Sequence, residues 1–145
     1  MNRGMQAIAP VLGCSGRVLL GLYFLLPGIS KIVGFDATSA YMATHGVPMV
    51  GIALVVTIVL QIGGGTALII GWQTRPTALM LAAMTLLINL LMHDFWNVYE
   101  GLSQAHETQN FVKNLAIMAG LLALAAGPAT AAFGLDSRTS KHQPD

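Results

Sequence analysis

Residues 49–70, with the sequence MVGIALVVTIVLQIGGGTALII, decide the fold of this chain. The segment contains no charged residue, and its only amide side chain is Gln61, near the middle. About 20 consecutive apolar residues are long enough to cross the hydrocarbon core of a bilayer as a helix. A lipid-embedded segment must satisfy its own backbone hydrogen bonds, and the segment lacks the alternation typical of a β-barrel strand. The stretch therefore predicts a transmembrane helix.

Three further apolar segments surround this one, at residues 11–32, 76–92 and 111–133, and the third helix is expected to continue to residue 97. Charged residues make up 9% of the chain and hydrophobic residues 54%, whereas soluble domains carry about 25% charged residues. The sequence thus predicts an all-α fold, a four-helix transmembrane bundle at residues 1–136, followed by a polar tail at 137–145.

Basic residues indicate the orientation of the bundle, because they favour the cytoplasmic side of a membrane. With the N-terminus inside, Arg3, Arg75 and Lys141 lie on the inner side, and Lys31 and Lys113 lie on the outer side. Both termini are therefore expected in the cytoplasm. The net charge of +1 gives no reason to expect nucleic acid as a partner.

Charged and amide groups at membrane depth are candidates for function, since their burial in lipid is costly. Arg17 and Lys31 lie near the two ends of the first helix. They either extend to the two membrane interfaces, or face the bundle as donors to an anion or to a quinone carbonyl. Gln61 is expected either to hydrogen-bond a neighbouring helix or to contact a ligand.

The third helix ends in a second group of candidates. Asn89, His93 and Trp96 are spaced to share one face of a helix, with Asp94 beside that face. A histidine next to a carboxylate can exchange protons near neutral pH, so His93 and Asp94 form the candidate catalytic pair. The alternative is a solvated helix end, with Trp96 in the aromatic belt of the membrane.

Lys113 and Asn114 open the fourth helix, where Lys113 can reach towards His93 or serve only as an interface anchor. Cys14 is the only cysteine, which excludes an intramolecular disulfide and a dithiol relay within the chain. His45 and His106 are expected in loops without a second ligand at metal spacing, so no metal site is predicted.

Small residues and turn residues organise the second helix. Gly63, Ala67 and Gly71 recur every four positions, a pattern that allows close packing of transmembrane helices. In the following turn, GWQTRP, Gly71 is expected to end one helix and Thr74 to cap the next.

Several motifs together resemble those of the DoxX family: GRVLLGLYFLLPGISKIVGF at 16–35, GWQTRP at 71–76, HDFWN at 93–97 and NFVKNLAIMAGLLAL at 110–124. The resemblance implies a four-helix protein of the bacterial inner membrane. Family members with assigned roles are linked to quinone-coupled sulfur oxidation or to membrane-associated oxidoreductase complexes. Gln61 departs from the family pattern, which often has a glutamate in the second helix.

Three functions remain open from the sequence. The chain could be a quinone-binding subunit of a redox system, with Trp96 stacking on the quinone ring, Lys113 or Asn114 holding a carbonyl, and electrons coming from a partner or a bound cofactor. It could instead be a non-enzymatic scaffold or assembly protein. A small transporter ranks below both, because a path would require a homo-oligomer. The expected partners are the lipid bilayer, an oxidoreductase protein and further copies of the chain.

Overall fold

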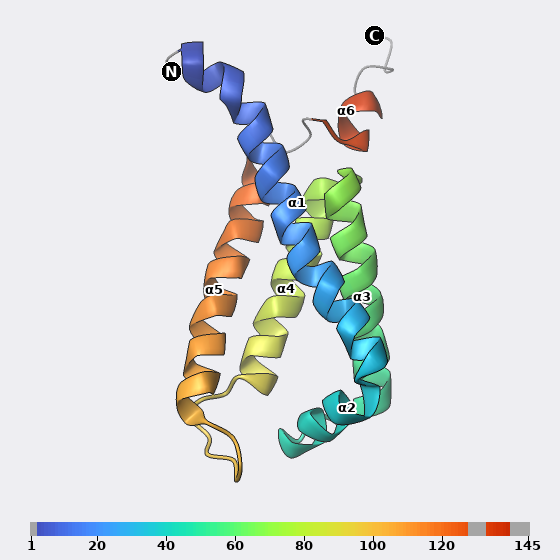
Figure 1. Cartoon of the computed structure of the whole chain (residues 1–145), viewed down its shortest axis with the longest axis vertical. Helices are drawn as coiled ribbons and strands as arrows, with labels where there is room; N and C mark the ends of the chain where they lie inside the picture. Colours follow the sequence, from blue (N-terminus) through green and yellow to red (C-terminus); the bar gives the residue numbers. More distant parts are fainter. Residues whose placement is uncertain (1–2, 128–132, 140–145) are drawn as a thin grey trace.

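The fold was taken from a computed structural model, which describes residues 3–127 and 133–139. The helices in these ranges are α1 (Arg3–Val33), α2 (Phe35–Thr44), α3 (Val50–Ile70), α4 (Thr74–Met92), α5 (Gln104–Ala126) and α6 (Leu135–Thr139). Four of them, α1, α3, α4 and α5, are long and apolar enough to cross a membrane. The predicted all-α fold with four transmembrane helices is confirmed (Figure 1).

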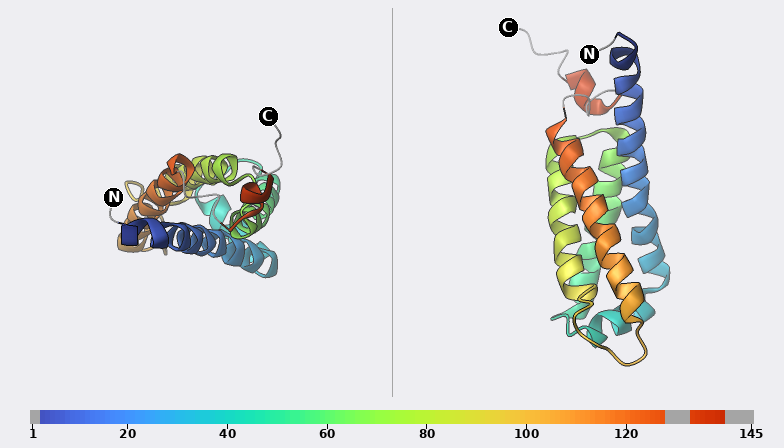
Figure 2. Two further views of the ribbon diagram at one scale, coloured as in Figure 1. Left: turned by 90° about the horizontal axis from the view of Figure 1, so that it is seen from above. Right: turned by 90° about the vertical axis from the view of Figure 1, so that its left-hand side faces the viewer.

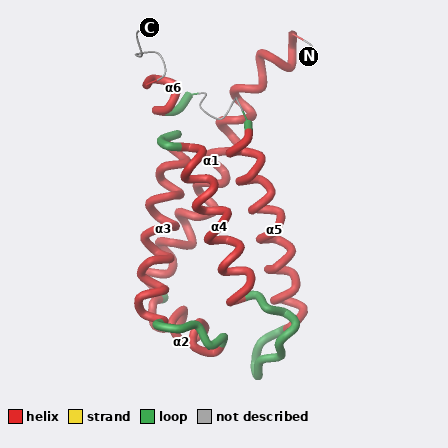
Figure 3. Tube along the Cα trace, turned by 180° about the vertical axis from the view of Figure 1, so that it is seen from behind, coloured by secondary structure: helices red, strands yellow, loops and turns green. Residues whose placement is uncertain are grey.

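The four long helices form two closely packed pairs, α1 with α3 and α4 with α5, and α3 also contacts α4. The short helix α2 lies across one end of the bundle, and the start of α1 and the helix α6 lie at the other end (Figures 1 and 2). The loop between α4 and α5 projects from the same end as α2 (Figure 3). Residues from α2 and from this loop can therefore meet at one end of the bundle.

Two glycines allow α1 and α3 to touch along their backbones. A Cβ atom on Gly21 would lie 2.7 Å from the carbonyl oxygen of Gly65, and one on Gly65 would lie 2.7 Å from the carbonyl oxygen of Gly21. Gly63 has open space where a Cβ would be. The prediction that Gly63 belongs to the packing face was therefore wrong, and Gly65, two positions along the helix, makes the close contact.

Three helix ends differ from the predicted ones. Helix α1 begins at Arg3 rather than at residue 11, and α5 begins at Gln104 rather than at residue 111. Helix α4 ends at Met92 rather than at residue 97. Hydropathy marks the most apolar part of a helix, whereas α1 begins in a mixed segment, RGMQAIAP, and α5 begins in a polar one, QAHETQN. Ser103 caps α5, because its Oγ accepts the backbone N–H of His106 at 3.4 Å. The predicted end of the fourth helix, at 128–133, falls largely outside the described residues.

The start of α4 is capped from a distant part of the chain. Asp136 accepts the backbone N–H groups of Gln73 and Thr74, each at 2.8 Å, and its own N–H donates to the carbonyl of Gly71 at 2.9 Å. Burial raises the pKa of Asp136, but these hydrogen bonds outweigh it and the pKa lies below its usual value. Gly71 ends α3 in the left-handed conformation (φ +68°) as predicted, whereas the predicted cap, Thr74, is the first residue of α4.

The predicted polar tail, 137–145, is only partly described. Residues 137–139 belong to the short helix α6, and residues 140–145 lie outside the described ranges.

Candidate functional site

A cavity of about 660 Å³ lies in the half of the bundle that α2 closes. This volume is within the range of small-molecule sites, roughly 300–1,000 Å³. The walls come from α1, α3, α4 and α5, and α2 contributes Thr38, Tyr41 and Met42 at the end. Much of the lining is apolar and includes Phe24, Pro27, Leu54, Ile88 and Met92.

Five of the predicted site residues line this cavity: Lys31 from α1, Gln61 from α3, Lys113 and Asn114 from α5, and His93 at the end of α4. They are widely separated in the sequence and approach one another only through the packing of the bundle. The structure thus brings the residues proposed for carbonyl binding to the same cavity as His93.

Gln61 and Asn114 differ in how their amides are used. The side-chain oxygen of Asn114 accepts a hydrogen bond from the Tyr23 hydroxyl at 3.1 Å, which joins α5 to α1. Gln61 is only 6% exposed, and its Oε1 has no hydrogen-bond partner among the described residues. The expected bond from Gln61 to a neighbouring helix is therefore not made by this oxygen. A buried acceptor without a partner is costly, and a ligand in the cavity can satisfy it.

Arg17 lies away from the cavity, towards the opposite end of the bundle. Arg17 is 1% exposed, so of the two predicted alternatives it faces the bundle rather than extending outward. Its Nη2 contacts the Sγ of Cys14 at 3.6 Å, and its Nη1 lies against Gly71 and Gly134, where no Cβ would fit. Arg17 therefore packs against the inner face of the turn between α3 and α4.

Asn89 and Trp96 do not share a helical face, because α4 ends at Met92. Asn89 is buried behind the cavity wall and donates from Nδ2 to the carbonyl of Phe111 at 3.0 Å, tying α4 to α5. Trp96 is 53% exposed in the loop and packs edge-on against Phe95 and Phe111. Neither side chain lines the cavity.

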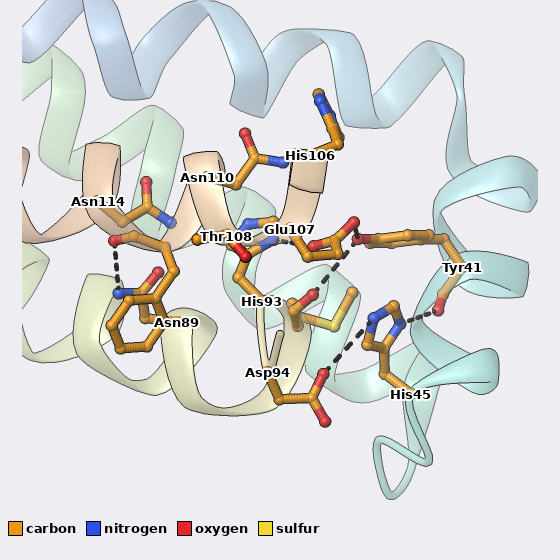
Figure 4. A network of polar contacts seen from close by, with 12 residues as sticks. Tyr41, His45, Asn89, His93, Asp94, His106, Glu107, Thr108, Asn110 and Asn114 are labelled. Atoms are coloured by element: carbon orange, nitrogen blue, oxygen red, sulfur yellow. Dashed lines mark hydrogen bonds and ion pairs between the residues drawn. The ribbon is translucent and has the colours of Figure 1, made fainter. Parts of the chain in front are cut away.

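His93 pairs with Glu107 rather than with Asp94 (Figure 4). Its Nδ1 lies 2.7 Å from Oε2 of Glu107, and the Tyr41 hydroxyl donates to Oε1 at 2.8 Å. Because an ionised carboxylate only accepts, Nδ1 carries the proton in this pair. The other ring nitrogen, Nε2, has no hydrogen-bond partner among the described residues. A histidine held by a carboxylate at a cavity wall can give or take a proton there.

Asp94 belongs to a separate polar cluster. Its Oδ2 accepts hydrogen bonds from Asn97 Nδ2 and from the Tyr99 hydroxyl, both at 2.6 Å. Its Oδ1 lies 3.8 Å from Nε2 of His45, the residue that ends α2. The predicted pairing of His93 with Asp94 was wrong because the helix stops before both residues, and their side chains turn to different partners.

Hydrogen bonding sets the charge of this outer cluster. Burial raises the pKa of Asp94, but the bonds from Tyr99 and Asn97 outweigh it, so the pKa lies below its usual value. The same bond raises the pKa of Tyr99. Burial, followed by the bond to Glu107, raises the pKa of Tyr41. The cluster thus holds Asp94 ionised and Tyr99 neutral at physiological pH, and Tyr41, beside Glu107, is neutral as well.

The sequence profile of the DoxX family matches residues 14–94, more than half of the chain. The chain belongs to the DoxX family. It is similar to two proteins of Escherichia coli (strain K12). It is 40% identical to inner membrane protein YqjF over 126 residues, covering 86% of this chain and 89% of that protein. It is 34% identical to inner membrane protein YphA over 133 residues, covering 91% and 93%. No solved structure matches the chain with significance.

Membership of the family and the four spanning helices together make this a multi-pass protein of the inner membrane. The predicted DoxX family, location and membrane fold are thereby confirmed.

Sequence reasoning on this DoxX family protein missed Glu107, Tyr41 and His45 as members of the site. A signal for Glu107 was present, because Ser103 followed by an acid in the next turn is typical of a helix start. That signal would have placed Glu107 on α5 instead of in a polar loop. Tyr41 and His45 meet their partners across more than 40 residues of sequence, and no local pattern predicts those contacts.

Proposed function

We propose that this DoxX family protein is a quinone-binding membrane subunit of a redox complex. The observation that carries the proposal is the His93–Glu107 pair, with a bond of 2.7 Å, at the wall of a largely apolar cavity within the membrane domain. Quinones are lipid-soluble, and a site for one requires an apolar slot with hydrogen-bonding groups for its two oxygen atoms.

The lining fits these requirements in three respects. The lysines, Lys31 and Lys113, are donors that can hold a carbonyl oxygen. His93, oriented by Glu107, can supply or accept the proton that accompanies reduction or oxidation of the ring. The buried Oε1 of Gln61, which has no partner among the described residues, can accept a hydrogen bond from a quinol hydroxyl.

Electrons would come from a partner protein or from a cofactor that it carries. Cys14 is the only cysteine, so the chain cannot form a dithiol couple of its own. The expected partner is an oxidoreductase subunit that reaches the bundle near the cavity end.

The test is retention of quinone by purified protein, with decylubiquinone as the probe and chromatography of the extracted quinone as the readout. His93→Gln is expected to lower retention by about tenfold, which corresponds to ~1.4 kcal/mol of binding free energy. His106→Gln is the matched control, because His106 is an exposed histidine on α5 that does not line the cavity. Equal retention by both variants, each folded, would rule out His93 as a quinone ligand.

A scaffold function is the second candidate, and the loop between α4 and α5 supports it. This loop projects from the bundle, and its Trp96 and Val98 side chains are 53% and 81% exposed (Figure 3). If docking is the main role, then Val98→Asp combined with Trp96→Ser should release a copurifying protein, and His93→Gln should not.

A further inference from the structure

Two lysines lie at the rim of the cavity. Lys31 is in the last turn of α1 and half-buried, and Lys113 is in the third turn of α5 and exposed. Both line the cavity. They come from different helices, and the end of α1 and the start of α5 lie apart in Figure 1.

These two ammonium groups lack a carboxylate partner. Lys31 has no hydrogen bond or ion pair with the described residues, and Lys113 bonds only to the neutral oxygen of Asn110, at 2.8 Å. None of the residues that line the cavity is an aspartate or a glutamate. Glu107, just behind the wall, is already bonded to His93 and Tyr41. These bonds leave the charge of Glu107 in place, so two ammonium groups at the rim stand against one carboxylate behind the wall, and the rim keeps an excess of positive charge.

The interior beyond the rim is apolar. Phe24, Pro27, Leu54 and Ile88 line the cavity from α1, α3 and α4. Charges beside apolar, low-dielectric walls attract an anion more strongly than they would in water. A molecule that satisfies both regions has an acidic head group and a hydrocarbon chain.

We propose that the cavity binds an anionic amphiphile, with its acidic head group between Lys31 and Lys113 and its hydrocarbon chain along the apolar walls. A free fatty acid and an anionic phospholipid share this chemistry. The proposal requires the cavity but no redox chemistry, so it does not rest on the quinone function. Because both ligands would occupy the same space, an anionic amphiphile would compete with quinone.

The first test compares two probes of nearly equal chain length and different charge. Oleate and oleyl alcohol are titrated into delipidated protein in an uncharged detergent, and binding is measured by native mass spectrometry. We expect oleate to bind at least about tenfold more tightly than oleyl alcohol. Equal affinities of the wild-type protein for the two probes would overturn the proposal without any variant.

The second test locates the head group. The double variant Lys31→Gln with Lys113→Gln should bind oleate no more tightly than it binds oleyl alcohol. Arg75→Gln is the control, because Arg75 is an exposed basic residue in the first turn of α4, outside the cavity. If the folded double variant retains the wild-type preference for oleate, the head group does not lie on these lysines and the proposal fails.

Two further arms distinguish the source of the ligand and separate this proposal from the quinone function. If phosphatidylglycerol binds more tightly than phosphatidylcholine and the double variant loses this preference, the ligand is a phospholipid. If only oleate is preferred, the ligand is a free fatty acid. Decylubiquinone is titrated in parallel. Binding of oleate without binding of decylubiquinone overturns only the quinone function, and the reverse result overturns only the present inference.

Discussion

Glu107 is a buried residue, 5% exposed, and both of its carboxylate oxygens accept hydrogen bonds. One oxygen receives the Tyr41 hydroxyl from α2 and the other receives His93 from the end of α4. Both partners donate to the carboxylate, and a neutral amide of the same shape would require one of them to become an acceptor. Glu107 thus connects three helices and fixes the ring of His93 at the cavity.

Replacing Glu107 with glutamine should destabilise the protein by about 1–3 kcal/mol. A glutamine has one accepting oxygen and one NH₂ group, so either Tyr41 or His93 would have to give up its present bond as a donor and accept instead. Thermal unfolding of the purified protein measures the effect, and Glu100→Gln, a change at an exposed loop glutamate, is the control. Equal stability of the two variants would mean that the bonds of Glu107 contribute little to the fold.

Asp94 should make stability depend on pH in the acidic range. Its pKa is lower in the folded state than in the unfolded state, so its contribution is complete above the ordinary aspartate value, about pH 4, and is lost as the pH falls through the folded value. Unfolding temperatures measured between pH 3 and pH 6 should fall more steeply for the wild type than for Asp94→Asn. The exposed Asp36→Asn variant should follow the wild-type curve.

Residue identities could be predicted better than residue contacts. The rarity of polar groups in apolar helices pointed to Lys31, Gln61 and Asn114, which line the cavity. The partner of His93 could not be found in this way, because Glu107 lies on another helix and the pairing depends on where α4 stops. Asp94, adjacent in sequence, was the wrong choice for the same reason.

The close packing of α1 against α3 depends on glycine where the two backbones touch. Helix α3 carries one glycine at such a contact, Gly65, and one in open space, Gly63, which can be compared directly. Gly65→Ala should destabilise the bundle by about 1–3 kcal/mol, because the added Cβ would lie 2.7 Å from the backbone of α1. Gly63→Ala should be neutral or slightly stabilising, since its Cβ meets open space and alanine favours a helix. Thermal unfolding in the same detergent measures both, and similar losses for the two variants would contradict this account of the interface.

Helices were predictable as elements, and their ends were not. The apolar run of α3 ends where the helix ends, and that of α4 starts within two residues of its helix, because glycine and proline mark the turn between them. The extra turns of α5 are polar and those of α1 are mixed, and the length needed to cross a bilayer does not predict such extensions. Local repeats of small residues also could not tell Gly63 from Gly65, because the choice depends on which face α1 covers.

The whole molecule has its two described chain ends at one end of the bundle and the cavity, with α2, at the other (Figure 2). The four-helix architecture followed from composition and hydropathy. The cavity did not, because its existence depends on how far the two helix pairs separate near α2. The side of the membrane that each end faces rests on the distribution of arginine and lysine alone.

We predict that the cavity end faces away from the cytoplasm. A green fluorescent protein fused after residue 145 should be fluorescent, and alkaline phosphatase at the same position should be inactive. Glu100→Cys, placed in a Cys14→Ser background, should react with a membrane-impermeant maleimide in cells whose outer barrier has been opened. Labelling of Glu100→Cys only after the inner membrane is permeabilised would reverse the orientation.

The capping of α4 by Asp136 has a consequence for the order in which the protein is made. Thr74, at the turn between α3 and α4, is synthesised 62 residues before Asp136, whose carboxylate binds its backbone N–H. During synthesis, the hairpin must therefore enter the membrane with that turn uncapped, and the turn is capped only when the segment that carries Asp136 returns to it. Synthesis of residue 136 is then itself a step in assembly, and a nascent chain stalled before it would hold inserted helices with one end still open.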